Sequence, residues 1–450
     1  MITLKPNPRL AILALACGAL GAGSAIAQNT KPPKAQLWMD VSTGTMAGMP
    51  EMDSLPTGAG GLLGGMMGGA RGGAAAGGNT SYGAARGANI MPPRVLDIAL
   101  HNSLRPGVEA TQAIPAGMRM GDSLPLVPPK AQATREPEPT EVPDEYRNEK
   151  PKGRVLIYWG CGTEVRRGQP RIIDFARGNP AEFGTAFAGR YAADRGARVS
   201  PAHALYPNEK NRVNLGRDSS LVGEHRVQGD GVPASMKFTL GAAQDLMPAI
   251  ALQTSGGLKD SMTANWAMVN NARAYYLHAM SKSGDDLIMW SSAEAPDTGM
   301  GLFDYLPNGT IERWLKDKVL LQPETTQCAI PKGIFAAAEG ARGDGMPAML
   351  RMMAYGGESN FAHPPRPADP RAVWEPEWAV RVRVKSHTIA MLGEEGARMR
   401  GGAAGMGQPA APMAGAQDAQ QPPVNPVQSA VESVLPVPNP VNLLKGLFGR

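Results

Sequence analysis

Glycine and proline are distributed unevenly along the chain, and this limits how much of it can fold into a core. Much of the excess of the 55 glycines and 41 prolines lies in residues 54–92 and 394–440, where the apolar residues show no periodicity. Segments of this composition bury too little apolar surface to offset the entropy lost on ordering. The sequence therefore predicts a disordered Gly/Pro-rich insert at 54–90 and a disordered tail at 394–450.

The first 27 residues have the three parts of a secretory signal peptide. Lys5 and Arg9 give a basic start, residues 10–20 are apolar, and a stretch of small residues ends in Ala25-Ile26-Ala27. The apolar run is about half as long as the roughly twenty residues that a membrane span needs. We expect cleavage after Ala27 and a periplasmic or secreted mature chain without a transmembrane helix.

A lipobox-like sequence lies inside the same segment. Residues 13–18 would make Cys17 a lipidated N-terminus. Because Arg9 stands close to it, the apolar run before Cys17 has only about seven residues, which is short for such a signal. A lipoprotein anchored through Cys17 is therefore the minority alternative.

Two cysteines, Cys161 and Cys328, remain in the mature chain. In an oxidising compartment they can either form one disulfide or stay as two free thiols. The sequence leaves both alternatives open.

Alternating apolar and polar residues predict several strands. The clearest is 378–385, where Trp378 and three valines point one way and Arg381, Arg383 and Lys385 point the other. A strand with this alternation has one face in the core and one in solvent. Further strands are predicted at 34–42, 109–114 and 153–159, and a three-strand meander at 262–269, 272–280 and 286–291. Helical spacing predicts helices at 94–104 and 308–319.

A segment near the middle of each half of the chain is duplicated. Glu109–Met118 recurs as Glu324–Ile334, with Cys328 as one inserted residue. Each copy follows a predicted helix and a Leu-x-Pro, and each is followed by a strand that ends in an aromatic residue and glycine. Several landmarks in the same order indicate a diverged tandem repeat.

The predicted fold is therefore mainly β, with tandem related β-sandwich-like domains that each carry a short helix. The first domain spans 28–245, with the insert 54–90 and a charged connector at 135–150. The second spans 246–393. The tail 394–450 ends in a short amphipathic helix at 440–449.

No catalytic residue and no cofactor site is predicted. The sequence lacks a phosphate-binding loop, a nucleophile elbow and an HExxH motif, and no two histidines stand at i, i+2 or i, i+4. Loss of Lys5 and Arg9 with the signal lowers the formal net charge from +5 to +3. This small excess does not indicate a nucleic-acid partner.

Methionines at M-x-x-M-x-x-M spacing form a weak candidate metal site. Met46, Met49 and Met52 carry thioethers, which are soft ligands suited to Cu(I). Methionine is frequent throughout the chain, with 25 residues in total, so chance explains the spacing equally well.

The predicted helix 440–449 is a candidate docking element. Val441, Leu444 and Phe448 lie along one of its sides. A helix of this length is unstable alone in water, so it needs a surface on an envelope protein or a membrane.

These patterns favour an exported cell-envelope protein with a non-enzymatic interaction or structural role. Two alternatives stay open. One is a periplasmic ligand-binding protein that takes a glycan, or a soft metal through the Met-rich loop, and the other is an exported hydrolase with an unmarked active site.

We expect the exported protein to begin at Gln28, which N-terminal sequencing of the protein from the cell envelope checks. A mature N-terminus at Cys17, with the mass of attached acyl chains, would contradict this prediction and establish the lipoprotein alternative.

Overall fold

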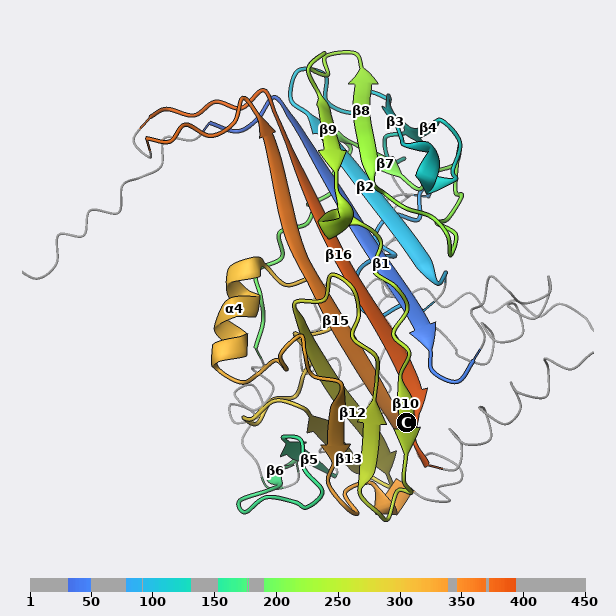
Figure 1. Ribbon diagram of the computed structural model, residues 1–450, viewed down its shortest axis with the longest axis vertical. Helices are drawn as coiled ribbons and strands as arrows, with labels where there is room; N and C mark the ends of the chain where they lie inside the picture. Colours follow the sequence, from blue (N-terminus) through green and yellow to red (C-terminus); the bar gives the residue numbers. More distant parts are fainter. Residues whose placement is uncertain are drawn as a thin grey trace, which may run out of the picture.

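The computed structural model describes residues 31–49, 78–90, 92–130, 153–175, 177, 190–338, 346–369 and 372–393. These residues form a mainly β structure (Figure 1). The predicted signal peptide, the connector 135–150 and the tail with its helix 440–449 lie outside the described residues, as does part of the predicted insert, 54–77.

A nine-stranded sheet forms the centre of the fold, with the strand order β6-β5-β13-β12-β15-β16-β1-β2-β7. Its strands are β1 (Ala35–Met46), β2 (Arg94–Asn102), β5 (Arg154–Trp159), β6 (Arg171–Asp174), β7 (His203–Tyr206), β12 (Ala274–Ser283), β13 (Asp286–Ser291), β15 (Met346–His363) and β16 (Trp378–Met391). Most neighbours are antiparallel, but β1 with β16 and β5 with β13 are parallel.

Two small sheets pack against one face of the large sheet and share one continuous apolar core with it. One consists of β3 (Ala110–Ala113), β4 (Ser123–Leu126), β8 (Gly223–Gly229) and β9 (Lys237–Leu240). The other consists of β10 (Gln253–Ser255), β11 (Met262–Asn265) and β14 (Gln327–Ile330). Short 3-10 turns lie at η2 (Ala116–Met118), η3 (Ala242–Gln244) and η4 (Ala336–Ala338).

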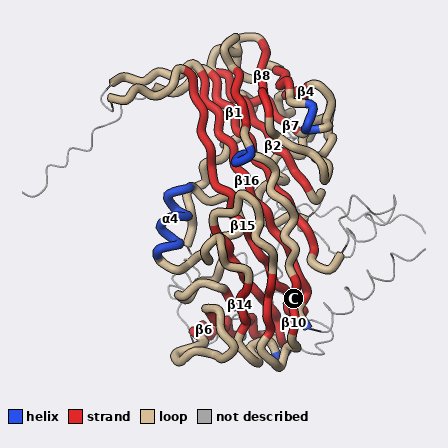
Figure 2. Tube along the Cα trace, viewed as in Figure 1, coloured by secondary structure: helices blue, strands red, loops and turns tan. Residues whose placement is uncertain are grey.

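The opposite face of the large sheet is covered by α4 (Asn308–Lys316) and by loops. Ile311 and Trp314 of α4 pack with Tyr355 of the sheet, and Tyr82 packs with Ala99 of β2. Both faces of the sheet are therefore buried over much of its length, and Figure 2 shows how far its strands run through the molecule.

The predicted division into two sandwich domains does not match the sheet order. Strands from 28–245 and strands from 246–393 contribute to the same nine-stranded sheet. Twelve consecutive residues of β1 pair with β16, from Ala35 opposite Trp378 to Met46 opposite Ile389. The boundary predicted at residue 245 therefore separates strands that belong to one sheet.

The helix predicted at 94–104 is wrong, because residues 94–102 form β2. Leu96, Ile98 and Leu100 contribute to the shared core, and Asp97 and Ala99 face the other side. A spacing of i, i+4 satisfies both a helical period and a period of two, so Leu96 and Leu100 did not distinguish them. The two copies of the duplicated segment therefore do not both follow a helix.

Several other predicted elements agree with the structure. The strands at 34–42 and 378–385 and the helix at 308–319 are confirmed by β1, β16 and α4. Of the predicted meander, β12 and β13 pair directly, whereas β11 pairs with β10 and β14 in the small sheet.

The predicted disordered insert is wrong for residues 78–90, which are ordered over the sheet. The backbone N–H groups of Gly83 and Ala85 donate to Asp97 Oδ2 at 2.9 and 2.8 Å. The Thr80 hydroxyl donates to the carbonyl of Pro207, and Tyr82 is only 4% exposed. Glycine-rich composition did not reveal these contacts because their partners, Asp97 and Pro207, lie outside the segment.

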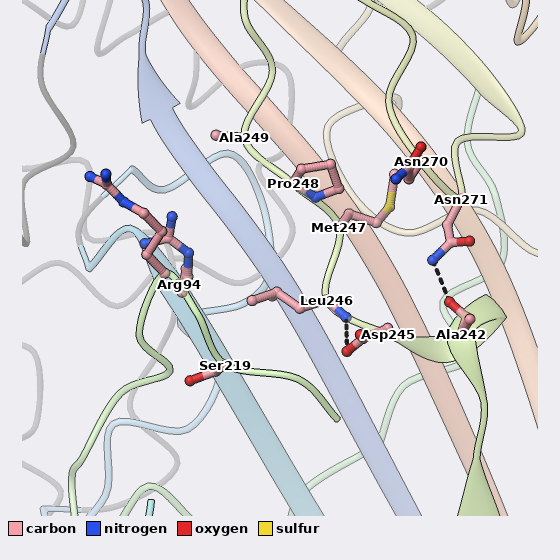
Figure 3. A pocket seen from close by; sticks show the side chains of 11 residues that line it. Arg94, Ser219, Ala242, Asp245, Leu246, Met247, Pro248, Ala249, Asn270 and Asn271 are labelled. Carbon is pink, nitrogen blue, oxygen red and sulfur yellow. Dashed lines mark hydrogen bonds between the residues drawn. The ribbon is translucent and has the colours of Figure 1, made fainter. Parts of the chain in front are cut away.

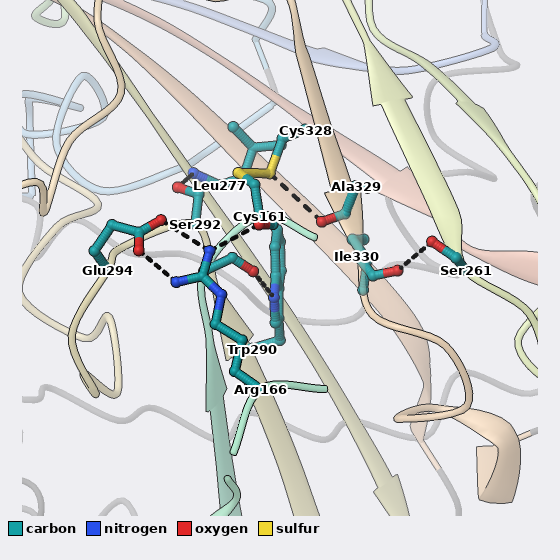
Figure 4. Close-up of a disulfide and its surroundings, with 11 residues drawn as sticks. Cys161, Arg166, Ser261, Leu277, Trp290, Ser292, Glu294, Cys328, Ala329 and Ile330 are labelled. Atoms are coloured by element: carbon teal, nitrogen blue, oxygen red, sulfur yellow. Dashed lines mark hydrogen bonds and ion pairs between the residues drawn. A yellow bond between two sulfur atoms is a disulfide. The ribbon is translucent and has the colours of Figure 1, made fainter. Parts of the chain in front are cut away.

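Cys161 and Cys328 form a disulfide that joins the large sheet to a small one (Figure 4). Cys161 follows β5 and Cys328 lies on β14. Next to the bond, the Gly162 N–H donates to the carbonyl of Ala329 at 2.9 Å, which extends the β14 ladder. The indole N–H of Trp290 donates to the carbonyl of Gly160 at 3.1 Å.

An arm projects from one end of the molecule, where β15 and β16 continue into the connection between them (Figure 1). We define the arm as residues 31–34, 363–369 and 372–377. Residues 363–369 are all exposed. The Lys31 N–H donates to the carbonyl of Trp374 at 3.0 Å, and the indole N–H of Trp374 donates to the carbonyl of Pro364 at the same distance. The first described residues therefore brace the arm.

We expect the double variant Cys161→Ser/Cys328→Ser to lower the free energy of unfolding by about 2–5 kcal/mol, because the disulfide closes a long loop in the unfolded chain. The two cysteines are 167 residues apart. Denaturant unfolding measures the change. Reductant is expected to destabilise the native protein but not the double variant, and equal stability of both under oxidising conditions would contradict the prediction.

Candidate functional site

A buried ion pair lies at the middle of the large sheet, on the face covered by loops. Asp40 of β1 and Arg383 of β16 stand opposite each other in the parallel register, and each is at most 3% exposed. Arg383 Nε donates to Asp40 Oδ1 at 2.6 Å and Nη2 donates to Oδ2 at 2.5 Å. This two-point contact supplies the hydrogen bonds without which buried charges are strongly unfavourable.

The prediction that Arg383 and Lys385 face solvent is therefore wrong. Lys385 is 1% exposed, and its ammonium donates to the carbonyl of Gly87 at 2.5 Å and to Asp304 Oδ1 at 3.2 Å. The Tyr305 ring lies 4.4 Å from both cationic groups. Alternation correctly predicted that these side chains leave the apolar core, but it did not reveal the loops that cover them.

His387 continues this row of polar side chains. Its Nε2 lies 2.7 Å from the carbonyl oxygen of Asn89. Burial, together with the nearby Lys385 charge, lowers the pKa of His387 to about 3. The ring is therefore neutral at physiological pH.

Asp97 is the second carboxylate of the cluster and lies opposite Asp40 on β2. Burial, reinforced by the Asp40 charge, raises the pKa of Asp97 to about 8, although the N–H groups of Ala85 and Gly83 act in the opposite direction. Asp97 is therefore protonated at neutral pH. The cluster therefore places a neutral acid beside the buried pair of Asp40 and Arg383.

Ser200 and Ser42 lie 3.1 and 3.4 Å from a ring nitrogen of His203 and His387. A further serine–histidine pair, Ser291 and His278, stands opposite on β13 and β12. Both residues are 0% exposed. Burial, with the neighbouring Arg351 charge, lowers the pKa of His278 to about 3. A general base needs a pKa near the working pH and contact with substrate. This pair has neither, so it gives no support to the hydrolase alternative.

A cavity of about 540 Å³ lies beside the start of β2, between the turns at 245–249 and 270–271 (Figure 3). This volume is within the range of small-molecule sites. Arg94 and Arg217 line it together with Asn270 and Asn271. The side-chain amide of Asn271 donates to the carbonyl of Ala242 at 2.7 Å, which ties two walls together.

The acidic residue of the cavity wall, Asp245, is already engaged. Its carboxylate accepts hydrogen bonds from the Ser220 hydroxyl at 2.8 Å and from the N–H groups of Leu221 and Leu246 at 2.7 and 2.8 Å. The charged lining therefore has two guanidinium groups, which make contacts of their own within the protein, and one hydrogen-bonded carboxylate.

The weak metal candidates are only partly described. Met46 and Met49 lie in the turn that ends β1, where the Met49 N–H donates to the Met46 carbonyl at 3.2 Å, and Met52 lies outside the described residues. Within the described part of the chain, no group of three or more histidine, cysteine, aspartate or glutamate side chains is placed to hold a metal ion. The docking candidates Val441, Leu444 and Phe448 also lie outside the described residues.

Sequence reasoning did not find Asp40 and Asp97 as members of a cluster. A signal existed, because each acid stands between two apolar residues, Asp40 between Met39 and Val41 and Asp97 between Leu96 and Ile98. A buried carboxylate needs a partner. The sequence does not say which of the 45 lysines and arginines supplies it.

Comparisons of the chain with protein-family models, with curated proteins and with solved structures yield no match. Among the described residues, no helix has the length and apolar character needed to cross a membrane.

We expect Asp97→Asn to remove a pH-dependent loss of stability. An unfolded aspartate has a pKa of about 4, so between pH 4 and pH 8 the unfolded chain releases a proton that the folded chain keeps. The contribution of Asp97 to stability is thus complete below about pH 4 and is lost as the pH rises through about 8. The loss amounts to about 5 kcal/mol.

Urea unfolding of the native protein and of Asp97→Asn between pH 5 and 9 measures this effect. The advantage of the variant over the native protein is expected to grow with pH. Asp230→Asn is the matched control, because Asp230 pairs with Arg105 at an exposed site. Parallel pH profiles for the native protein and Asp97→Asn would contradict the prediction.

Proposed function

We propose that this chain is an exported protein of the cell envelope with a non-enzymatic interaction or structural role. The observation that carries the proposal is the arm. It projects beyond the packed body of the protein and presents exposed residues that the fold itself does not use (Figure 1).

The arm is held in a defined shape by its own contacts. The Arg366 guanidinium lies 5.6 Å from the centre of the Trp374 ring, and Lys31 pairs with Glu375 at 2.9 Å. Val373 is 60% exposed beside them. An ordered projection with an exposed apolar residue loses little entropy when it binds, which suits a docking element.

The disulfide supports the proposed location outside the cytoplasm. Disulfides persist in oxidising compartments and are rare in cytosolic proteins. The bond between Cys161 and Cys328 agrees with the secretory signal that the first 27 residues suggest. The predicted helix 440–449 would provide a second contact with an envelope protein or a membrane surface.

Ligand binding is the second candidate function, and the cavity at Arg94 and Arg217 is the observation that favours it. The buried state of Ser291 and His278 gives no comparable support for hydrolysis.

We expect a photo-crosslinking amino acid at Val373, in the protein expressed in its own envelope, to give a crosslinked product of defined mass. Met268 provides the matched control position, because it is 66% exposed but lies on the body of the protein. The same residue placed there is expected to give no such product.

Truncation of residues 436–450 tests the second contact in the same cells. Loss of the Val373 product on truncation would indicate that the tail and the arm bind one partner. Equal labelling from Val373 and Met268, or none from either, would contradict the proposed role of the arm.

A further inference from the structure

Four methionines that are far apart in sequence form one row across the large sheet. Met280 of β12 stands opposite Met289 of β13 on one side and opposite Met349 of β15 on the other. Met349 in turn stands opposite Met391 of β16. Residues directly opposite each other on antiparallel strands share one face of the sheet, with their Cβ atoms about 4.5–5.5 Å apart. We call these four residues the methionine row. Their separation in the chain explains why local spacing did not reveal them.

Methionine is concentrated around this row. Met280 and Met289 belong to an apolar cluster on the sheet face opposite the small sheets, and Met300, Met346 and Met349 pack against it. Five of the eleven residues of this cluster are methionine, whereas the whole chain has 25 methionines in 450 residues. Packing alone requires no such concentration, because leucine or isoleucine fills a core equally well.

The row runs from the interior of the protein toward solvent. Met289 is 0% exposed and Met280 is 9% exposed, whereas Met349 and Met391 are half-buried. Met391 is also the last residue of β16. Two thioethers of the row are therefore partly open to solvent, and a third, that of Met280, lies next to them at the edge of the core.

We propose that Met280, Met349 and Met391 bind one Cu(I) ion through their thioether sulfurs. Thioethers are soft ligands that select Cu(I). A thioether is neutral and carries no proton, so its lone pairs need no deprotonation before they bind a metal. The hydrogen bonds between the three paired strands fix the spacing of the three residues, which leaves only side-chain rotations to be ordered when the ion binds. The proposal does not rest on the interaction role of the arm.

The charges near the row favour a monovalent ion over a divalent one. Arg351 stands two residues after Met349 on β15, and Lys282 stands two residues after Met280 on β12. The Arg351 guanidinium lies 5.2 Å from the centre of the Phe303 ring. Repulsion between these cations and a bound ion is proportional to the charge of the ion. It therefore disfavours Cu(I) half as strongly as a divalent ion at the same place.

The row ends beside Met46, which belongs to the candidate metal site predicted from the sequence. Met46 of β1 is the register partner of Ile389, and Ile389 stands two residues before Met391 on β16. Side chains two residues apart on a strand point to the same face, so Met46 and Met391 are diagonal neighbours on one face. The row and the methionine-rich turn thus predict ions at adjoining places, and substitutions distinguish them.

The test is calorimetric titration of the tag-free protein from the cell envelope with AgNO₃ in chloride-free buffer and, separately, with a Cu(I)–acetonitrile complex under argon. Ag⁺ serves as a soft monovalent probe that does not oxidise. We expect one tightly bound ion per chain in the native protein. Met349→Leu and Met391→Leu are each expected to weaken binding by at least about tenfold. Exchange of methionine for leucine nearly conserves side-chain volume, so the variants keep the fold.

The matched control is Met353→Leu. Met353 lies on the same face of β15, four residues or about 13 Å along the strand from Met349, and packs in a different apolar cluster. This variant is expected to bind the ions as the native protein does.

X-ray absorption of the Cu(I) form gives an independent readout. We expect a first shell of sulfur ligands in the native protein and one sulfur fewer in Met391→Leu, a half-buried position at the end of its strand. Binding that Met349→Leu and Met391→Leu leave unchanged would overturn the proposal. Failure of the folded native protein to bind Cu(I) would overturn it as well. So would binding that is lost on changing Met46 and Met49 to leucine but not on changing the row.

Discussion

The parallel pairing of β1 with β16, with the Asp40–Arg383 ion pair at its middle, is the constraint on which the rest of the structure depends. It joins the first described strand to the last, across most of the chain. Two charges buried on a sheet face are tolerated only if each is paired and hydrogen-bonded, and removal of one partner costs about 3–5 kcal/mol. The loops that exclude water from this pair are therefore as important as the strands that carry it.

The burial of the sheet centre also limits which parts of the molecule a ligand or partner can reach. The polar side chains at the centre of the sheet are engaged with each other, with backbone carbonyls and with the Tyr305 ring, and the Ser291–His278 pair is sealed. The features that reach solvent lie at the periphery. They include the arm at one end and the cavity at the start of β2.

The sequence predicted local features better than their arrangement. Alternation identified β1 and β16, and apolar spacing identified α4, because each pattern repeats over many residues. The same reasoning placed a helix where β2 lies, since Leu96 and Leu100 satisfy both periods. It also assigned Arg383 to solvent, because the side of a strand that faces away from an apolar core is usually exposed. The loops that cover this face of the sheet bury Arg383 instead.

Local sequence patterns were enough to show that the chain is rich in β-strands, which residues of β16 enter the apolar core, and which two cysteines the proposed mature chain has available for a disulfide. The folded chain was needed to show that both halves build one sheet, that Asp40 contacts Arg383, and that His101 lies beside His203. The physical reason is the same in each case. Local patterns set which side of a strand is apolar, whereas strand pairing between distant segments depends on packing over the whole fold, which no local spacing encodes.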